Sequence, residues 1–336
     1  MERITLKKLA QLLGVSTSTV SKALKDSYEI GQETKDRIKA LAEKLHYKPN
    51  ASASSLRKNS SKTIGVIVPL ITNSFYALAI DGIESVAKAK DYHVLIYITY
   101  EEYSAEVESI NQLQNGRVDG ILSSVSHSTT NYDHLAEVKS KDIPLVLFDR
   151  ICESLNVPWV TIDNFQSGFS ATAHLIKNGC RRIAYLSYAK HLSTTGNRLN
   201  GYLSALEKYK MPFDSKLVIE CTNNNEENHL LIKKLLQGND APDGIFSCIE
   251  RLALITYNVC NEIKLRIPAD LKIVSFSNLQ TASLLNPSLS TMTPDAFYIG
   301  KKAAEILFEN IEKKNFGRVE QITLPAMLVE RESTRQ

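Results

Sequence analysis

Residues 5–24 read TLKKLAQLLGVSTSTVSKAL, and this stretch decides the fold of the first sixty residues. Its apolar side chains recur at i, i+3, i+4 and i+7, so they share one helix face: Leu6, Leu9, Ala10 and Leu13. Thr5 is a residue type that caps helix starts, and Gly14 is the type that ends helices in the left-handed conformation. The pattern therefore predicts an amphipathic helix over residues 6–13.

A second helix is expected after Ser16, which can cap its start. Its outward face offers short hydroxyls and one cation: Thr17, Ser18, Ser21 and Lys22. Residues 32–47, QETKDRIKALAEKLHY, repeat the helical spacing and predict a third helix. A helix, a glycine turn, a short helix and a longer packing helix form the layout of a helix-turn-helix unit. Short polar groups on the second helix suit contacts with phosphates and base edges in the major groove.

Positive charge is concentrated at the start of the chain. Residues 1–62 carry 13 Lys or Arg and 6 Asp or Glu, a balance of +7, whereas the remainder carries 27 basic and 31 acidic side chains, a balance of −4. A basic module on a mildly acidic body indicates a polyanionic partner for the module alone. Together with the helix-turn-helix layout, this favours double-stranded DNA.

Composition excludes several other classes of protein. The 336 residues are 43% hydrophobic and 23% charged, as in ordinary globular proteins, and the apolar runs are too short to cross a bilayer. The N-terminus interleaves charges with apolar residues and lacks a small-residue cleavage site, so it is not expected to be a signal peptide. The five cysteines form no CxxC pair. We therefore expect reduced thiols in a cytoplasmic protein, without a metal site or cofactor.

From Ile64 onward, short β-branched runs alternate with helical stretches. The runs that have the length and composition of strands are residues 64–69, 93–99, 120–125, 144–149, 159–163, 182–187, 244–248, 271–277 and 322–331. Apolar strands separated by helices form parallel sheets that are covered on both faces. So many strands predict an α/β fold with two doubly wound parallel-sheet subdomains, whose ligands bind in the cleft between them.

Motifs in both parts resemble the LacI/GalR (lactose-repressor) family of bacterial transcriptional regulators. TLKKLAQLLGVSTSTVSKAL, followed by YKPN and ASASSLR, is similar to the family's helix-turn-helix headpiece and hinge helix. IGVIVPLITNSFYALAIDGIE, IPLVLFDR, NRLNGY and LVERES are similar to its periplasmic-binding-protein-like core. The resemblance implies a DNA-binding domain, a hinge helix with linker, and an effector-binding and dimerisation core, at residues 1–49, 50–61 and 62–336. Within the core it implies subdomain one at 62–163 and 292–322, and subdomain two at 164–291 and 323–336.

The implied hinge helix orders on operator DNA, where two copies meet in the minor groove. Such a short segment should be coil when free, because an isolated helix needs ~12–15 residues. Small residues such as Ala53 let two helices approach closely, and Leu56 is then the apolar wedge that kinks the duplex. The candidate DNA-binding residues are Thr5, Leu6, Ser16, Thr17, Ser18, Ser21, Lys22, Tyr47, Asn50, Ala53 and Leu56.

Effector-binding residues are implied where the family's motifs match. Phe75 and Tyr76 match aromatic residues that stack on or cover the ligand, with packing in the core as the alternative. Asp149 and Arg198 match charged ligand contacts, with structural ion pairs as the alternative. The candidate effector-binding residues are Phe75, Tyr76, Asp149, Arg150, Arg198, Ser277 and Asn278.

The chain departs from the family pattern at three places. Ile249-Glu250 stands where the family has Asn-Asp, Ser277-Asn278 replaces a motif with a strand-ending Asp, and Pro294 replaces a common Gln. These changes remove polar ligand contacts, which favours an effector less polar than a free sugar, or none.

The leading hypothesis is a transcriptional repressor that binds a near-palindromic operator as a homodimer under the control of a small molecule, such as a sugar or related metabolite. Because no heptad pattern follows the motif LVERES, we expect a dimer rather than a tetramer. One alternative keeps DNA binding but replaces the metabolite by a protein cofactor. The other, an enzyme on a Rossmann-like body, is disfavoured because the motifs GxGxxG, GxxxxGK[ST], GxSxG and HExxH are missing from the sequence.

Overall fold

The structure, a computed structural model, describes residues 4–45, 47, 60–189, 192–313 and 319–335. The chain divides into two compact units, residues 1–61 and 62–336. Asn50, Ala53 and Leu56 lie outside the described residues, so the hinge helix stays a prediction. None of the described helices is long and apolar enough to span a membrane.

Three helices form the described part of the first unit: α1 (Leu6–Leu13), α2 (Thr17–Leu24) and α3 (Gln32–Lys44). Their ends follow from the local sequence. The side chain of Thr5 accepts a hydrogen bond from the N–H of Lys8, and Ser16 accepts one from the N–H of Thr19. Gly14 ends α1 with φ 66°, in the left-handed region that glycine adopts without strain. The two caps and the terminating glycine predicted from the sequence are thus confirmed.

The three helices enclose a small core of their own. Leu9, Val20 and Ile38, one from each helix, are at most 1% exposed and belong to a single cluster of buried apolar residues. Because the buried face of α2 is used for this packing, its opposite face remains available to solvent.

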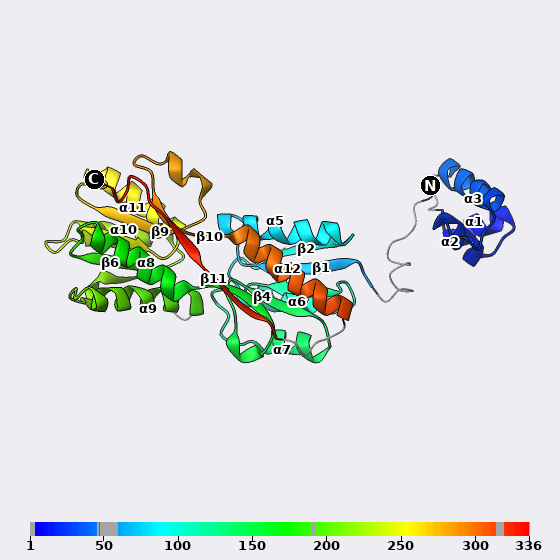
Figure 1. The fold of residues 1–336 in the computed structure, drawn as a ribbon, viewed down its shortest axis with the longest axis horizontal. Coiled ribbons are helices and arrows are strands. Elements are labelled where there is room, and N and C mark those ends of the chain that lie inside the picture. Colours follow the sequence, from blue (N-terminus) through cyan, green and yellow to red (C-terminus); the bar gives the residue numbers. More distant parts are fainter. Residues whose placement is uncertain (1–3, 46, 48–59, 190–191, 314–318, 336) are drawn as a thin grey trace. The chain divides into compact units, whose positions relative to one another are not determined.

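The second unit contains two six-stranded sheets (Figure 1). In spatial order, the first sheet consists of β11 (Gln321–Leu324), β5 (Trp159–Ile162), β4 (Leu145–Phe148), β3 (Gly120–Ser123), β1 (Thr63–Val68) and β2 (His93–Ile98). The second consists of β12 (Ala326–Val329), β10 (Ser290–Pro294), β9 (Lys272–Phe276), β8 (Gly244–Ser247), β6 (Ile183–Tyr188) and β7 (Val218–Cys221). Among the described strand pairs, β10 with β12 is antiparallel and the others are parallel.

Helices cover both faces of each sheet, as the apolar strands require. The helices of the first sheet are α5 (Ser74–Ala89), α6 (Tyr103–Leu113), α7 (Asp133–Ser140) and α12 (Ala296–Lys313). Those of the second are α8 (Asn164–Lys177), α9 (Ser193–Lys208), α10 (Asn225–Leu236) and α11 (Glu250–Ile263). The short helices η1 (Glu153–Leu155), η2 (Ser215–Leu217) and η3 (Gln280–Leu284) lie in the connections. α5 packs against α12, α6 against α7, α8 against α9 and α10 against α11.

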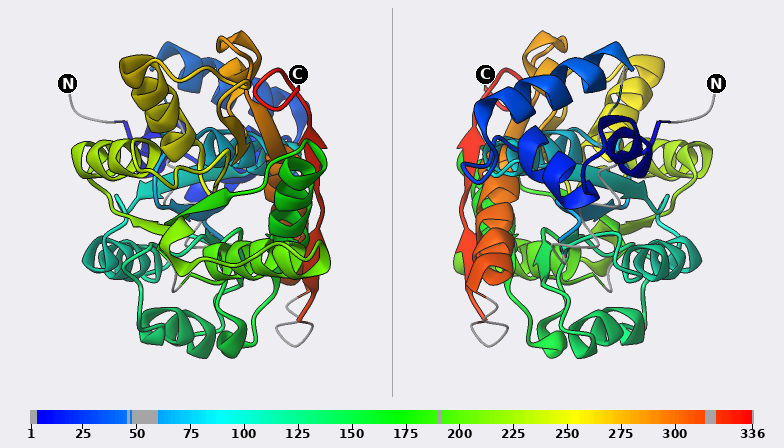
Figure 2. Two further views of the ribbon diagram at one scale, coloured as in Figure 1. Left: turned by 90° about the vertical axis from the view of Figure 1, so that its left-hand side faces the viewer. Right: turned by 90° about the vertical axis from the view of Figure 1, so that its right-hand side faces the viewer.

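The chain passes between the sheets after β5, after β10 and between β11 and β12 (Figures 1 and 2). The expected subdomain boundaries at 292 and 323 therefore need correction, since they fall inside β10 and β11, and the crossings follow Pro294 and Leu324. The predicted strand 322–331 is in fact two strands in different sheets. Pro325 separates them, because proline has no N–H with which to continue a ladder.

Two strands were not predicted from the sequence. β7 and β10 read VIEC and STMTP. Polar residues interrupt both sequences, so neither contains the continuous apolar run from which the other strands were predicted. Neither strand changes the predicted fold class, which is confirmed.

Candidate functional site

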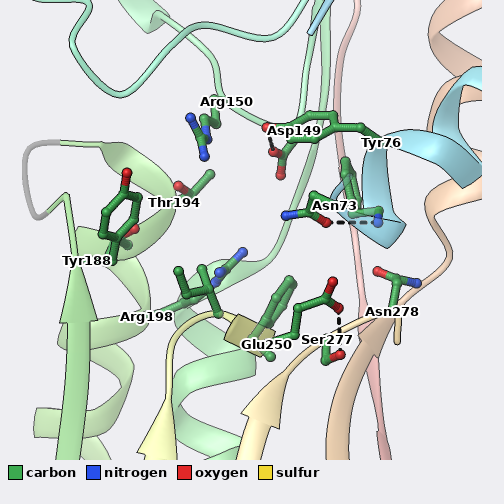
Figure 3. A pocket seen from close by; sticks show the side chains of 14 residues that line it. Asn73, Tyr76, Asp149, Arg150, Tyr188, Thr194, Arg198, Glu250, Ser277 and Asn278 are labelled. Atoms are coloured by element: carbon green, nitrogen blue, oxygen red, sulfur yellow. Dashed lines mark hydrogen bonds between the residues drawn. The ribbon is translucent and has the colours of Figure 1, made fainter. Parts of the chain in front are cut away.

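A cavity lies within the second unit, where the carboxyl ends of the strands of both sheets meet (Figure 3). The first sheet and its helices contribute Asn73, Phe75, Tyr76, Asp149 and Arg150 to its lining. The second contributes Tyr188, Thr194, Thr195, Arg198, Ile249, Glu250, Phe276, Ser277 and Asn278. All seven candidate effector residues therefore line one cavity, although they come from distant parts of the sequence.

Tyr76 and Asp149 form a buried pair on the side of the first sheet. The Tyr76 hydroxyl donates to Oδ2 of Asp149 at 2.9 Å and lies 3.2 Å from the Ser124 hydroxyl. Tyr76 is only 2% exposed, and its ring packs edge-on against Phe75 and Phe148. Most of the Tyr76 ring thus belongs to the core, which was the alternative considered for it, while its hydroxyl fixes Asp149 at the cavity.

Burial dominates the electrostatics of Asp149. Removal from water raises the pKa of its carboxyl above the ordinary value, although the charges of Arg150 and Arg198 and the hydrogen bond from Tyr76 oppose the rise. Its backbone has φ 59°, in the left-handed region. The turn after β4 therefore directs this carboxylate to the cavity.

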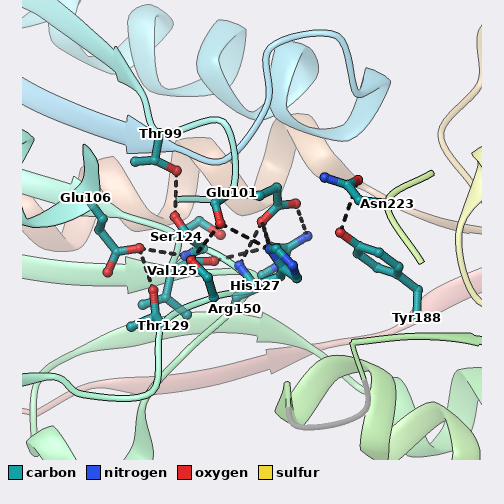
Figure 4. Close-up of polar contacts among 12 residues, drawn as sticks. Thr99, Glu101, Glu106, Ser124, Val125, His127, Thr129, Arg150, Tyr188 and Asn223 are labelled. Carbon is teal, nitrogen blue, oxygen red and sulfur yellow. Dashed lines mark hydrogen bonds and ion pairs between the residues drawn. The ribbon is translucent and has the colours of Figure 1, made fainter. Parts of the chain in front are cut away.

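Arg150 is held by a carboxylate outside the cavity lining (Figure 4). Its Nη1 and Nη2 donate to Oε2 and Oε1 of Glu101 at 2.7 and 3.0 Å. Burial alone would raise the pKa of Glu101, but the charge and hydrogen bonds of Arg150 and the N–H of His127 lower it. Glu101 and Arg150 thus form a structural ion pair, so Arg150 contributes little free charge to the cavity.

Arg198 is buried without a carboxylate bonded to it among the described residues. Its Nε donates to Oδ1 of Asn164 at 2.8 Å, its Nη1 donates to the Cys248 carbonyl at 2.7 Å, and its guanidinium stacks on the Phe276 ring. Burial lowers the pKa of the guanidinium, opposed by the charge of Asp149. These bonds orient the planar group while its Nη2 has no protein partner among the described residues.

Glu250 is a cavity residue that sequence reasoning missed as a contact. Its Oε2 accepts a hydrogen bond from the Ser277 hydroxyl at 2.8 Å, and its Oε1 lies 3.4 Å from the backbone N of Ser74. The sequence pattern places Glu250 in a departure, Ile249-Glu250, that is expected to remove polar ligand contacts. In the structure its carboxylate lies beside Ser277 and adds a polar group to the cavity. The cavity wall is accordingly more polar than the three departures suggested, because Ile249 is the one apolar residue among the departing residues that line it in the described structure.

Asn278 presents a different kind of polar group. Its Nδ2 donates to the Pro294 carbonyl at 2.7 Å, whereas its Oδ1 is buried without a hydrogen-bond partner among the described residues. A buried acceptor without a partner is unfavourable. A ligand hydroxyl or N–H at this position would satisfy it.

Among the described residues, a ring stack and a hydrogen bond link the halves of the second unit across the cavity. The rings of His127 and Tyr188 stack at 5.7 Å between centroids, with an interplanar angle of 19°. Tyr188 in turn donates its hydroxyl to Asn223 at 3.4 Å (Figure 4). The second contact is the long hydrogen bond from Ser74 to Glu250. The hydrogen bond is long and the ring stack is a neutral contact, so each contributes little to holding the two halves together.

In the first unit, the candidate DNA-binding residues fall into distinct groups. Thr5 and Ser16 cap helices, and Leu6 packs at the edge of the core. Tyr47 also packs against the core, and its N–H donates to the Ala42 carbonyl at 2.8 Å. Thr17, Ser18 and Lys22 are exposed and Ser21 is partly exposed, all on α2. Lys22 forms an ion pair with Glu29.

Comparison with known proteins assigns both units to one family. Residues 5–50 match the family model of bacterial regulatory proteins of the lacI family, and residues 61–332 match the model of periplasmic binding proteins and the sugar binding domain of the LacI family. The chain belongs to the LacI family. The family suggested by the sequence motifs is thus confirmed.

Curated relatives of this LacI-family protein are transcriptional repressors. The HTH-type transcriptional repressor PurR of Vibrio atlanticus and the ribose operon repressor of Haemophilus influenzae are each 30% identical over 311 residues, which cover 93% of this chain and of the relative. The protein is therefore a DNA-binding transcriptional repressor with a metabolite-binding core, and not an enzyme.

Solved structures agree with the fold of this LacI-family chain. The Lac repressor dimer bound to operator and an anti-inducer has a TM-score of 0.86 at 20% identity, with both chains fully covered. A LacI family regulator from Enterococcus faecium with bound ribose has a TM-score of 0.72 at 26% identity, with 81% of this chain and 98% of that chain covered. The first similarity establishes the fold alone, because its identity is low.

Proposed function

We propose that the protein is a cytoplasmic, homodimeric repressor that binds a near-palindromic operator, and that a small polar molecule in the cavity controls its affinity for DNA. The observation that carries this proposal is one cavity, built from both sheets, on a chain that also contains a helix-turn-helix unit. A ligand that contacts both halves has different affinities for open and closed arrangements, which is the requirement for control of a remote site.

The polar groups of the cavity support a ligand with several hydroxyls. Arg198 offers an N–H without a protein partner among the described residues, and Asn278 offers an acceptor without one. Asp149 lines the cavity and has one carboxylate oxygen, Oδ2, bonded to Tyr76, which leaves Oδ1 for a ligand hydroxyl. Carbohydrates present alternating donors and acceptors of this kind. The ribose operon repressor of Haemophilus influenzae and the ribose-bound regulator of Enterococcus faecium add support by relationship.

Exposed apolar side chains support the dimer. Leu95 and Ile96 are 39% and 41% exposed on β2, an edge strand of the first sheet. Leu230 and Leu231 are also exposed on α10, which packs on β7 at the corresponding edge of the second sheet. Apolar groups and a free strand edge in solvent are unfavourable for a monomer. A second copy of the chain would cover both edges.

We assign DNA contact to the exposed face of α2, through Thr17, Ser18, Ser21 and Lys22. On binding, Lys22 would exchange its ion pair with Glu29 for a phosphate or a guanine edge. On the family resemblance, Ala53 and Leu56 are assigned to the minor groove, and Asn50 to a phosphate contact or to the cap of the hinge helix. Two such units in a dimer would meet half-sites about one helical turn apart.

The first experiment is selection of genomic fragments by the purified full-length protein at near-physiological salt, followed by sequencing. We expect recovery of a recurrent near-palindrome of roughly 14–20 base pairs. Titration of small molecules related to the neighbouring genes should then change the affinity for that site by about 5- to 150-fold, the usual range of allosteric coupling.

The selection is repeated with cell extract, divided into small-molecule and protein fractions. A motif that requires the small-molecule fraction supports control through the cavity by a corepressor. Dependence on the protein fraction alone would replace the metabolite by a protein cofactor. Failure to recover any motif under all three conditions would refute sequence-specific operator binding.

A further inference from the structure

The charges that line the cavity do not balance. Its charged side chains among the described residues are Asp149, Arg150, Arg198 and Glu250. Arg150 donates both of its terminal nitrogens to Glu101, so the positive charge of Arg150 is already compensated. Two carboxylates then face the cavity against one guanidinium. The described lining therefore carries a surplus of one negative charge.

Glu250 is the carboxylate without a cation. Among the described residues it makes no ion pair, and both of its hydrogen bonds come from neutral groups, the Ser277 hydroxyl and the Ser74 N–H. The Ser74 bond is 3.4 Å long and crosses the cleft. The next residue, Arg251, points elsewhere, with its guanidinium bonded to the carbonyls of Thr222 and Asn223.

The position of Glu250 makes its carboxylate available to a ligand. Figure 3 shows Glu250 directed into the cavity between Arg198 and Asn278, on the side opposite Asp149 and Asn73. The residue begins α11, which follows strand β8 in the chain. The start of this helix thus places a negative group at the cavity wall.

Glu250 has no cation partner among the described residues, and the start of α11 compensates its charge only in part. Such a carboxylate in a confined cavity disfavours a purely neutral ligand. Closure over such a ligand would remove water from Glu250 without supplying a charge, which costs free energy. A protonated amine would supply the charge and form charge-assisted hydrogen bonds, which are roughly twice as strong as neutral ones. Removal of one such bond typically costs more than tenfold in affinity.

We propose that the effector is an amino sugar, a monosaccharide whose protonated amine binds the carboxylate of Glu250. Its hydroxyls would bind Asp149, the free Nη2 of Arg198 and the unpartnered Oδ1 of Asn278. This inference rests on the proposed control by a small polar molecule. It adds that a protonated amine is the group of that molecule which the cavity recognises. Glu250 is then the specificity-determining residue of the cavity.

The test uses full-length protein and three matched sets: glucose, glucosamine and N-acetylglucosamine, and the corresponding galactose and mannose compounds. Isothermal titration calorimetry at pH 7 gives the affinity for each. In at least one set, we expect the amine to bind about tenfold or more tightly than both its hydroxyl and its acetylated partner. The same amine should change operator affinity.

Three variants test whether the negative charge of Glu250 selects the amine. Glu250→Gln keeps the size of the side chain and should abolish the preference for the amine, whereas Glu250→Asp keeps the charge and should retain part of it. Glu153→Gln makes the same chemical change at an exposed position outside the cavity and should behave as wild type. Thermal melting without ligand checks that each variant folds.

Binding of a neutral sugar as tight as that of its amine partner would overturn the inference and leave the proposed function intact. So would binding of none of the nine compounds to folded wild-type protein. An amine preference that survives in Glu250→Gln would also overturn it, because another group would then select the amine. Failure of the operator selection, by contrast, would count against the proposed function itself.

Discussion

At the scale of single residues, the cavity contains groups that cost stability in the absence of a ligand. Asp149 is an example, because burial raises the pKa of its carboxyl. A carboxyl with a raised folded-state pKa contributes stability that is fully present below its unfolded pKa and is lost as pH rises through the folded pKa. At neutral pH, the ionised side chain therefore destabilises the effector-free protein.

The change Asp149→Asn should reveal this cost. Asparagine tolerates the left-handed backbone at φ 59°, and its Oδ1 can still accept from Tyr76. Without ligand, we expect the variant to melt at a higher temperature than wild type at pH 7, and the gap to narrow as pH falls toward 4. Calorimetric melting across this range measures the gap. Asp142→Asn is the matched control, because Asp142 is exposed and has a similar backbone angle, φ 55°. If its melting temperature differed from that of wild type with the same pH dependence, burial of Asp149 would be excluded as the cause.

At the scale of helices and strands, the sequence predicts what nearby residues determine. Thr5, Gly14 and Ser16 act within three or four positions of themselves, so their roles as caps and terminator were visible in the sequence. The apolar strands were visible for the same reason. β7 and β10 were not, because their neighbours in the sheets, and not their own composition, determine that they are strands.

The candidate site shows the same difference between features that nearby residues determine and features that distant residues determine. The seven candidates were found because the family's motifs mark the segments that follow strands. Glu250 follows β8 as well, but its contacts are with Ser277 and with Ser74, 176 positions away along the chain. Arg150 was a candidate, yet its engagement by Glu101, 49 positions away, could not be read from the sequence. Contacts between distant segments determine which charged side chains have a partner of opposite charge. These contacts can be seen only in the folded structure.

The packing of α5 on α12 gives a prediction at this scale. A Cβ at Gly300 would lie 1.9 Å from the Ala79 carbonyl oxygen, a backbone atom that cannot move without displacing α5. Gly300→Ala should therefore lower the free energy of unfolding by about 1–3 kcal/mol, as overpacking does. Urea denaturation measures the change. Gly238→Ala is the control, because its added Cβ would meet atoms at ordinary distances of 3.6 Å or more; equal losses in both variants would contradict the packing argument.

At the scale of the whole molecule, function requires two linked equilibria. The cavity is built from both sheets and is spanned by weak contacts, His127 on Tyr188 and Ser74 to Glu250. A ligand can therefore shift the arrangement of the two halves with modest binding energy. In the proposed mechanism, this shift affects DNA binding only if two helix-turn-helix units act together, because one short recognition helix offers few contacts.

The proposed mechanism therefore depends on dimerisation, and β2 is where we expect substitutions to disrupt the proposed dimer. In the double variant Leu95→Lys and Ile96→Lys, like charges would meet across the proposed interface, so sedimentation should detect monomers. Operator affinity should fall by about 100-fold or more, because the second half-site no longer binds intramolecularly. Met327→Lys on β12, where Met327 is 72% exposed at the opposite edge, should leave both properties unchanged. A dimeric double variant with normal operator affinity would place the interface away from β2.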